Sequence, residues 1–148
     1  PYPRPRDLHH CLGKGKHEVG YAPEEVEEAI SELVEELAEI GDKANILKAA
    51  AYFHARFEYI HPFADGNGRV GRTLLNYFLM THGEPPVIIY DEDKKEYYTA
   101  LERYDEQEDL DALVELLKAQ TAKTWEKTLE RSQGKVKHIR KKLNEFEP

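Results

Sequence analysis

The chain has 148 residues, of which 40% are hydrophobic and 34% charged, and its formal net charge is −8 at pH 7. These values predict one soluble globular domain that is long enough to bury a hydrophobic core. No run approaches the roughly 20 apolar residues that a membrane span requires, so we expect no membrane partner.

The charge is unevenly distributed along the chain. Residues 1–117 hold 12 Lys or Arg against 25 Asp or Glu, whereas residues 118–148 hold 9 against 4. The acidic main part argues against a nucleic-acid surface, which would have to be basic. The basic tail either docks on an acidic partner or is a solvated helix with its own charge pattern, and the composition favours the solvated helix.

The ends and the cysteine content bear on the origin of the chain. It starts at Pro1 without an initiator Met or an apolar signal segment, so we expect a piece of a longer protein. Cys11 is the only cysteine, which excludes an internal disulfide and favours a reducing compartment such as the cytoplasm.

The first elements in chain order are a hairpin and a helix. LGKGKHEVGY, residues 12–21, has the glycine spacing of a small β-hairpin. A helix follows from Glu24 to Ile40, with Pro23 placed to open it and Gly41 to close it. Its apolar positions recur with the 3.6-residue helical period: Val26, Ala29, Ile30, Leu33, Val34 and Leu37.

The middle of the chain predicts two more helices. Residues 46–60 are apolar around much of the helix circumference, which is typical of a central buried helix. This helix should end at His61, because Pro62 disfavours helical geometry in the residue before it. The next helix should start around Arg69 and stop at Gly83, and the VIIY run that follows (87–90) should be a short buried extended piece.

Helices also account for the remainder of the chain. Asp91 is expected to cap a helix through Tyr104, and Asp109 another past Trp125. Gly134 should break or kink this last run, ahead of an amphipathic stretch with one apolar face, Val136, Ile139, Leu143 and Phe146. The prediction is an all-α helical bundle with an N-terminal hairpin, divided into residues 1–22, 23–132 and 133–148.

Residues 61–72, HPFADGNGRVGR, carry the chemistry. They satisfy the dinucleotide pattern G-x-G-x-x-G and nearly satisfy the P-loop pattern, but both patterns need a preceding strand. The DGNG run also resembles a calcium loop, yet Arg69 stands at a ligand position and Asn76 where that loop needs Glu. All three interpretations therefore fail on context.

The dinucleotide and P-loop motifs have one physical property in common, an anion-binding turn at the start of a helix, and this property still applies here. A glycine-rich turn that enters a helix directs free backbone N–H groups at an anion, and the guanidinium groups of Arg69 and Arg72 match phosphate oxygens. Asp65 has no evident cation of its own other than one brought by a ligand, and Mg²⁺ bound to phosphate suits it. His61 either caps its helix or, beside this turn, acts as a general base; the context favours the base.

At these residues the sequence resembles the Fic-domain family, because residues 61–72 match every fixed position of the signature H-P-F-x-D-G-N-G-R-x-x-R. The resemblance extends over roughly Leu8 to Trp125 and includes AAAYFHARFEYI and YYTAL. It implies an all-helical Fic-type bundle that transfers AMP from ATP to a hydroxyl of a target protein and releases pyrophosphate. ATP and Mg²⁺ are the implied substrate and cofactor.

The resemblance also implies a role for each matching residue. His61 would be the general base, Asp65 would hold Mg²⁺ and Arg69 and Arg72 would bind the phosphates. Gly66, Asn67 and Gly68 would form the anion-binding turn, and Phe63 would anchor the loop in the core. Tyr98 and Leu101 fit an adenine pocket and an ordinary helix core equally well. The hairpin around residues 12–19 would be the flap along which the target protein docks.

Gly68 bears on the type of transfer, because relatives that phosphorylate carry Lys there, so Gly68 favours nucleotide transfer. The alternatives that remain are another nucleotide or phospho-group on the same scaffold, or a catalytically silent nucleotide-binding module. An inhibitory motif, [ST]-x-x-x-E-[GN], is matched only in part by SELVEE (31–36), which we interpret as a chance match. Restraint would then come from a separate antitoxin protein, from an inhibitory helix upstream, or from nothing, and removal of AMP is not expected.

Overall fold

The computed structural model describes residues 20–40 and 45–144, and within these ranges the regular elements are all helical. The expected hairpin at residues 12–19 lies outside the described residues, as do Cys11 and Gly41. The prediction of an all-α protein is confirmed for the described part of the chain. The division of the chain at residues 22 and 132 stays a prediction.

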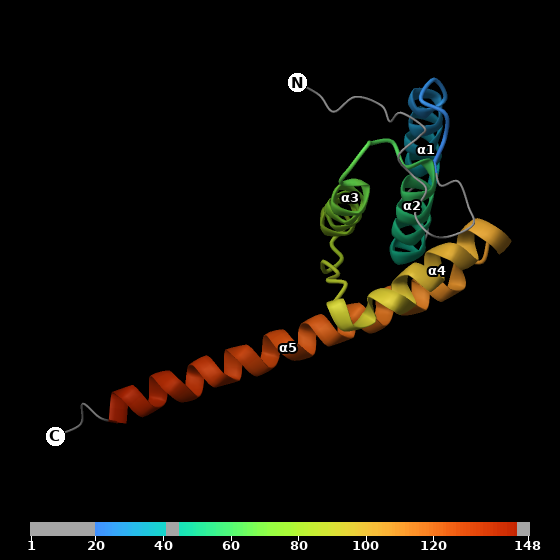
Figure 1. Ribbon diagram of the computed structural model, residues 1–148. Coiled ribbons are helices and arrows are strands. Elements are labelled where there is room, and N and C mark those ends of the chain that lie inside the picture. The colour runs from blue at the N-terminus through green and yellow to red at the C-terminus, as the bar shows by residue number, and fades with distance from the viewer. Residues whose placement is uncertain (1–19, 41–44, 145–148) are drawn as a thin grey trace.

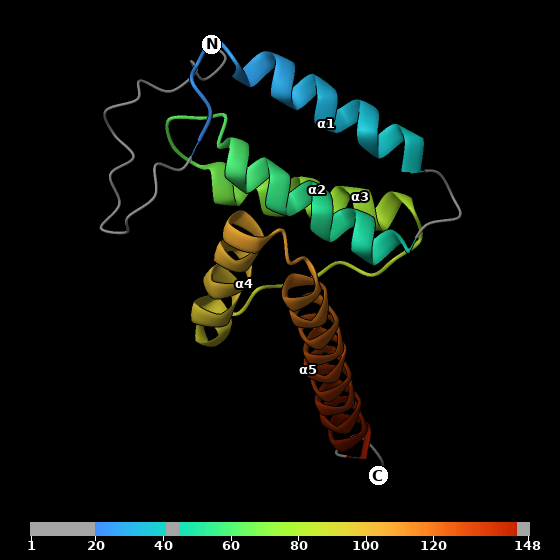
Figure 2. The same cartoon turned by 90° about the vertical axis from the view of Figure 1, so that its right-hand side faces the viewer.

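Helix α2 (Ile46–Ile60) is the centre of the fold, and its bounds are those predicted from the sequence. It contacts α1 (Val26–Ile40), α3 (Asn67–Thr81), α4 (Lys94–Gln107) and α5 (Asp111–Asn144), and Figure 2 shows it between α1 and the lower helices. Asn45 caps its start, because the side-chain oxygen of Asn45 accepts the Lys48 N–H at 3.2 Å.

The core has two parts that meet at α2. Phe53, Phe57 and Ile60 pack against Ala29 and Leu33 of α1, while the opposite side of α2 packs against α3, α4 and α5 through a second cluster that includes Ala50, Ala51, Leu75, Tyr97, Leu113 and Leu117. A helix covered on both sides needs apolar residues around its circumference. The pattern of residues 46–60 is therefore explained by its position.

Two expectations from the sequence need correction, and one residue of the apolar period of α1 is exposed. Val34 is 55% exposed, although it follows the helical period of α1, because the buried stripe is narrower than that pattern. In the VIIY segment only Val87 is buried, held by two hydrogen bonds to the side chain of Asn76, while Ile88 is exposed. Helix α5 continues through Gly134 without a break, since one glycine costs only about 1 kcal/mol within a long helix.

The two termini of the fold differ in their surroundings. Tyr21 donates its N–H to Ile60 O at 3.1 Å, so the segment before α1 is tied to the end of α2. At the other end, α5 extends well past the remaining helices (Figure 1). None of the helices in the described ranges is both long enough and apolar enough to cross a membrane.

Candidate nucleotide-phosphate site

His61 directly follows α2 and stands in the left-handed region, with φ 53° and ψ 58°. Its backbone N–H closes the helix by donating to Phe57 O at 3.0 Å. This conformation is rare for residues other than glycine, and it turns the chain from α2 into the loop that leads to α3. The backbone of His61 thus caps the helix, and its side chain stands at the start of the loop.

Asn67 fixes the shape of that loop. Its side-chain oxygen accepts the Phe63 N–H at 2.8 Å and its amide donates to Phe63 O at 2.6 Å. Asn67 is buried, and the ring of Phe63 packs against the α1–α2 core. The amide thus holds the loop through its oxygen and one of its N–H groups, and the backbone N–H of Asn67 is one of the free donors at the start of α3. Its role in the anion-binding turn stays a prediction.

The N-terminus of α3 has an open cap. Gly66 is the capping residue, with φ 86°, and it has no side chain that could accept a hydrogen bond from the first turn. The first backbone bond of the helix runs from Val70 N–H to Gly66 O at 3.0 Å. The N–H groups before Val70 therefore have no acceptor within the helix, which is the arrangement that binds anions at helix N-termini.

Arg69 and Arg72 both fold back over this turn. A β-carbon placed on Gly66 would stand 3.3 Å from Nη2 of Arg69, and one placed on Gly68 would stand 3.0 Å from Nη1 of Arg72. Each guanidinium thus covers the glycine three or four residues before it. The two glycines leave room for the arginines, and the turn gathers two cations and several N–H groups at one place.

The expectation that Asp65 has no cation of its own is wrong. Its carboxylate forms an ion pair with Arg69 at 3.2 Å, as residues four apart around a helix start can do. The two side chains are 91% and 77% exposed respectively, so the pair is weak and a ligand can replace it.

Asp65 fits the magnesium ion that the family resemblance implies. Among residues 20–40 and 45–144 no group of three or more His, Cys, Asp or Glu side chains gathers to hold a metal. Magnesium, however, commonly uses one or two carboxylates together with waters and substrate phosphates. A single exposed carboxylate beside the anion-binding turn suits a magnesium ion that arrives with a nucleotide.

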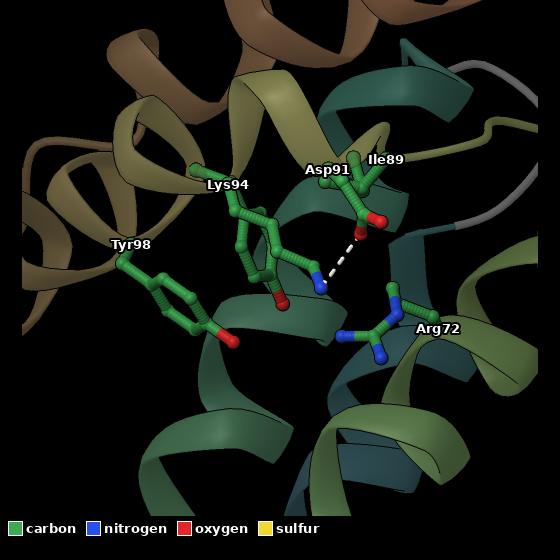
Figure 3. A pocket seen from close by; sticks show the side chains of 6 residues that line it. Arg72, Ile89, Asp91, Lys94 and Tyr98 are labelled. Atoms are coloured by element: carbon green, nitrogen blue, oxygen red, sulfur yellow. Dashed lines mark ion pairs between the residues drawn. The ribbon is translucent and has the colours of Figure 1, made fainter.

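A small cavity of about 180 Å³ lies next to Arg72. Tyr98 lines it, as do Asp91 and Lys94, which form an ion pair at 2.7 Å (Figure 3). Leu101 is instead buried in the core, so of the two adenine-pocket candidates only Tyr98 borders the cavity. The sequence analysis missed Asp91 and Lys94, because nothing in their local pattern places them beside a residue some twenty positions earlier.

Buried polar side chains of α2 and α4 pack beside α3 at Gly71. His54 Nε2 and Tyr97 Oη are 2.8 Å apart, and Glu58 Oε1 lies 3.9 Å from His54. Burial lowers the pKa of His54 to about 4 and raises the pKa of Glu58 to about 7, although the charge of Arg72 opposes the second effect. Both groups are therefore neutral between these values, and their contact is then not an ion pair.

The SELVEE segment lies in the half of α1 that is remote from this site. Glu36 accepts a hydrogen bond from Tyr52 Oη at 2.7 Å, and Tyr52 stands nine residues, or about 13 Å of helix, before His61. The start of α1, not this half, lies near the end of α2, as the bond between Tyr21 and Ile60 shows. This placement agrees with a chance match to the inhibitory motif.

Known proteins resemble this all-helical domain in sequence and in fold. A sequence profile described as "Fic/DOC family" matches residues 3–79. The chain belongs to the Fic/DOC family. It is 42% identical over 81 residues to "Protein adenylyltransferase fic-1" of Caenorhabditis briggsae, covering 54% of this chain and 16% of that protein. It is 51% identical over 55 residues to "Protein adenylyltransferase Fic" of Nematostella vectensis, covering 37% and 13%.

Solved structures agree with the family. A Fic-domain-containing signalling protein from Bacteroides thetaiotaomicron superposes with a TM-score of 0.67 at 28% identity, over 78% of this chain and 50% of that one. Fic-1 from Caenorhabditis elegans gives 0.66 at 32% identity, over 74% and 33%. The chain thus spans half or less of these proteins, and about a sixth or less of the curated relatives above.

Proposed function

We propose that this chain is a protein adenylyltransferase, which transfers AMP from ATP to a side-chain hydroxyl of a target protein. The observation that carries the proposal is the N-terminus of α3, which has no capping side chain, is covered by two guanidinium groups and is separated from His61 by a short loop, residues 62–66. Such a site binds phosphate groups next to a titratable imidazole. The names of the relatives support transfer of AMP.

The proposed reaction uses the residues of this site in separate roles. The N–H groups of the anion-binding turn, Arg69 and Arg72 bind and orient the phosphates. His61 accepts the proton of the hydroxyl, whose oxygen bonds to the α-phosphorus while the bond to the pyrophosphate group breaks. Asp65 would hold magnesium, which supplies charge neutralisation on the phosphates when bound. Docking of the target along residues 12–19 is part of the proposal, and those residues lie outside the described ranges.

The test is a paired labelling assay in a cell lysate with Mg²⁺ and either α- or γ-labelled ATP. We expect label on protein from α-labelled ATP alone. His61→Ala should lower this transfer by about 100-fold or more, because a general base contributes that much. His61→Asn should do the same; asparagine tolerates the left-handed conformation of residue 61, so this variant separates loss of the base from backbone strain.

His82→Ala is the matched control, because His82 also follows a helix but is exposed at the far end of α3. It should keep its activity. Label from γ-labelled ATP would indicate phosphate transfer, and label only from another α-labelled nucleotide would indicate a different donor. Nucleotide binding without any transfer would favour the silent binding module.

A further inference from the structure

The second half of α5 stands apart from the rest of the molecule. The helix comprises 34 residues and is therefore about 50 Å long. Its first part is anchored in the core by Leu113 and Leu117, and Gln120 is still buried. Its later part projects beyond the other helices in both views (Figures 1 and 2).

One face of the helix is occupied where it leaves the body. Lys123 lies 2.5 Å from Asp93, and Lys127 lies 3.3 Å from Glu92 and 3.6 Å from the ring centre of Tyr90. Two residues along a helix turn by about 200°. Positions 125 and 129 consequently lie on the face opposite Lys127.

Two large apolar side chains are exposed on that opposite face where the helix leaves the body. Trp125 is 52% and Leu129 58% exposed. The sequence continues with the same alternating steps of four and three residues to Ser132, Val136, Ile139 and Leu143, all within α5. We call these six positions the seam. A stripe this narrow with a 3.5-residue repeat is typical of coiled-coil contacts, whereas helices that lie on membranes have a broad apolar face.

The seam continues into a cleft on the body. Trp125 also lines a cavity of about 290 Å³ between the start of the projecting part and the end of α3. Apolar atoms of Leu79, Pro85 and Ala122 border it as well. Trp125 therefore belongs both to this cleft and to the exposed face of the helix, which gives a docking helix a defined end position.

Charge decides which helix fits the seam. Residues 131–144 contain no Asp or Glu and six cationic residues, Arg131, Lys135, Lys137, Arg140, Lys141 and Lys142. By the spacing of the seam, Lys135, Arg140 and Lys142 are the cations that flank it, so a second copy in parallel would bring like charges together beside the contact, which is repulsive. We propose that the seam binds an amphipathic helix of a partner protein whose seam-flanking residues are acidic.

Trp125 reports on this interaction directly, since it is the only tryptophan in the chain. We would titrate the protein with a designed heptad peptide that carries Leu at the two seam positions and Glu at both flanking positions. Its own charges keep this peptide from pairing with itself. We expect a blue shift of Trp125 emission that weakens with added salt, and no shift with an otherwise identical peptide carrying Lys in place of Glu.

Two variants test the seam itself. Leu129→Gln should weaken binding of the Glu peptide by about tenfold or more, because a leucine side chain loses its burial in the complex. Glu130→Gln is the matched control, since it places the same residue at an exposed position outside the seam, and it should change affinity by less than about twofold. Both original side chains are exposed, so circular dichroism should show the same folded helix content.

Three results would overturn the proposal. Equal binding of the Glu and Lys peptides would show that charge does not select the partner. A dimer in sedimentation analysis that Leu129→Gln dissociates would make a second copy the occupant. A Trp125 shift with phosphatidylserine vesicles and none with the Glu peptide would make the face a membrane-binding one.

Discussion

Gly68 and Gly71 lie one turn apart in α3, yet the structure uses their missing side chains for opposite purposes. At Gly71 a β-carbon would clash with Oε1 of Glu58 and stand 3.1 Å from the ring of Phe57, so this glycine lets α2 and α3 approach closely. At Gly68 the neighbour is the end of the Arg72 side chain, and the space belongs to the proposed phosphate site. The same residue type thus serves the fold at one position and ligand access at the other.

The largest effect we expect comes from Gly71→Ala. The obstructing atoms belong to a packed interface, so the methyl group should lower the free energy of unfolding by about 2–3 kcal/mol. Gly68→Ala meets only a flexible guanidinium and should change stability by less than about 1 kcal/mol. Urea denaturation of the two variants measures the difference.

Gly134→Ala is the reference for this pair. Gly134 is also helical, and nothing lies within 4 Å of its added β-carbon, so alanine should stabilise the protein by about 0.5–1 kcal/mol. If Gly71→Ala and Gly68→Ala destabilised the protein equally, the distinction between a packing glycine and an access glycine would be incorrect.

A smaller effect should follow from Asn67→Ala, which tests the loop between the two helices. Removal of the amide deletes two hydrogen bonds to the backbone of Phe63 and should cost about 1–2 kcal/mol. The exposed ion pair of Asp65 and Arg69 offers the contrast, because Asp65→Ala should cost less than about 1 kcal/mol. Equal losses, measured by thermal unfolding, would mean that Asn67 does not hold the loop.

The parts of this molecule that sequence analysis predicted are those fixed by local patterns. The apolar residues and Pro62 give the bounds of α2, and the arrangement of Gly66, Arg69 and Arg72 within one helix entry follows from their spacing. In each case the deciding residues lie within the element or directly beside it in the sequence. The grouping of these residues around one helix start could thus be predicted from the sequence, and their binding of phosphate stays a prediction.

Features that depend on distant contacts could not be predicted. The charged and aromatic groups around Arg72 come from α4 and the segment before it, far from Arg72 in the sequence. His54 is buried because other helices cover α2 on both sides. Gly134 does not break α5 for a related reason. The free-energy cost of one glycine is smaller than the stability that the rest of the long helix supplies. The two hydrogen bonds from the Asn67 side chain to the backbone of Phe63 depend on the shape of the loop, which the sequence pattern does not predict.

A further predicted effect concerns pH and the packed groups behind Gly71, His54 and Glu58. Glu58 faces His54 on its own helix, Arg72 of α3 and Asp105 of α4. Burial raises its pKa from 4.5 to about 7, so the folded protein holds a proton that the unfolded chain has lost between these values. The resulting stabilisation is complete below pH 4.5 and is lost as the pH rises through 7. The lowered pKa of His54 acts in the opposite direction, between about 4 and 6.5.

The two effects offset each other at acidic pH, and above about pH 6.5 only the Glu58 term should remain. Between pH 6 and pH 8 the free energy of unfolding should therefore fall by about 1 kcal/mol through this group. Glu58→Gln should remove that part of the slope, because glutamine does not titrate, while other histidines titrate alike in both proteins. Urea denaturation of both proteins at these two pH values gives the difference directly. Parallel slopes would mean that the carboxyl is already ionised in the folded protein and that Arg72 outweighs burial at this position.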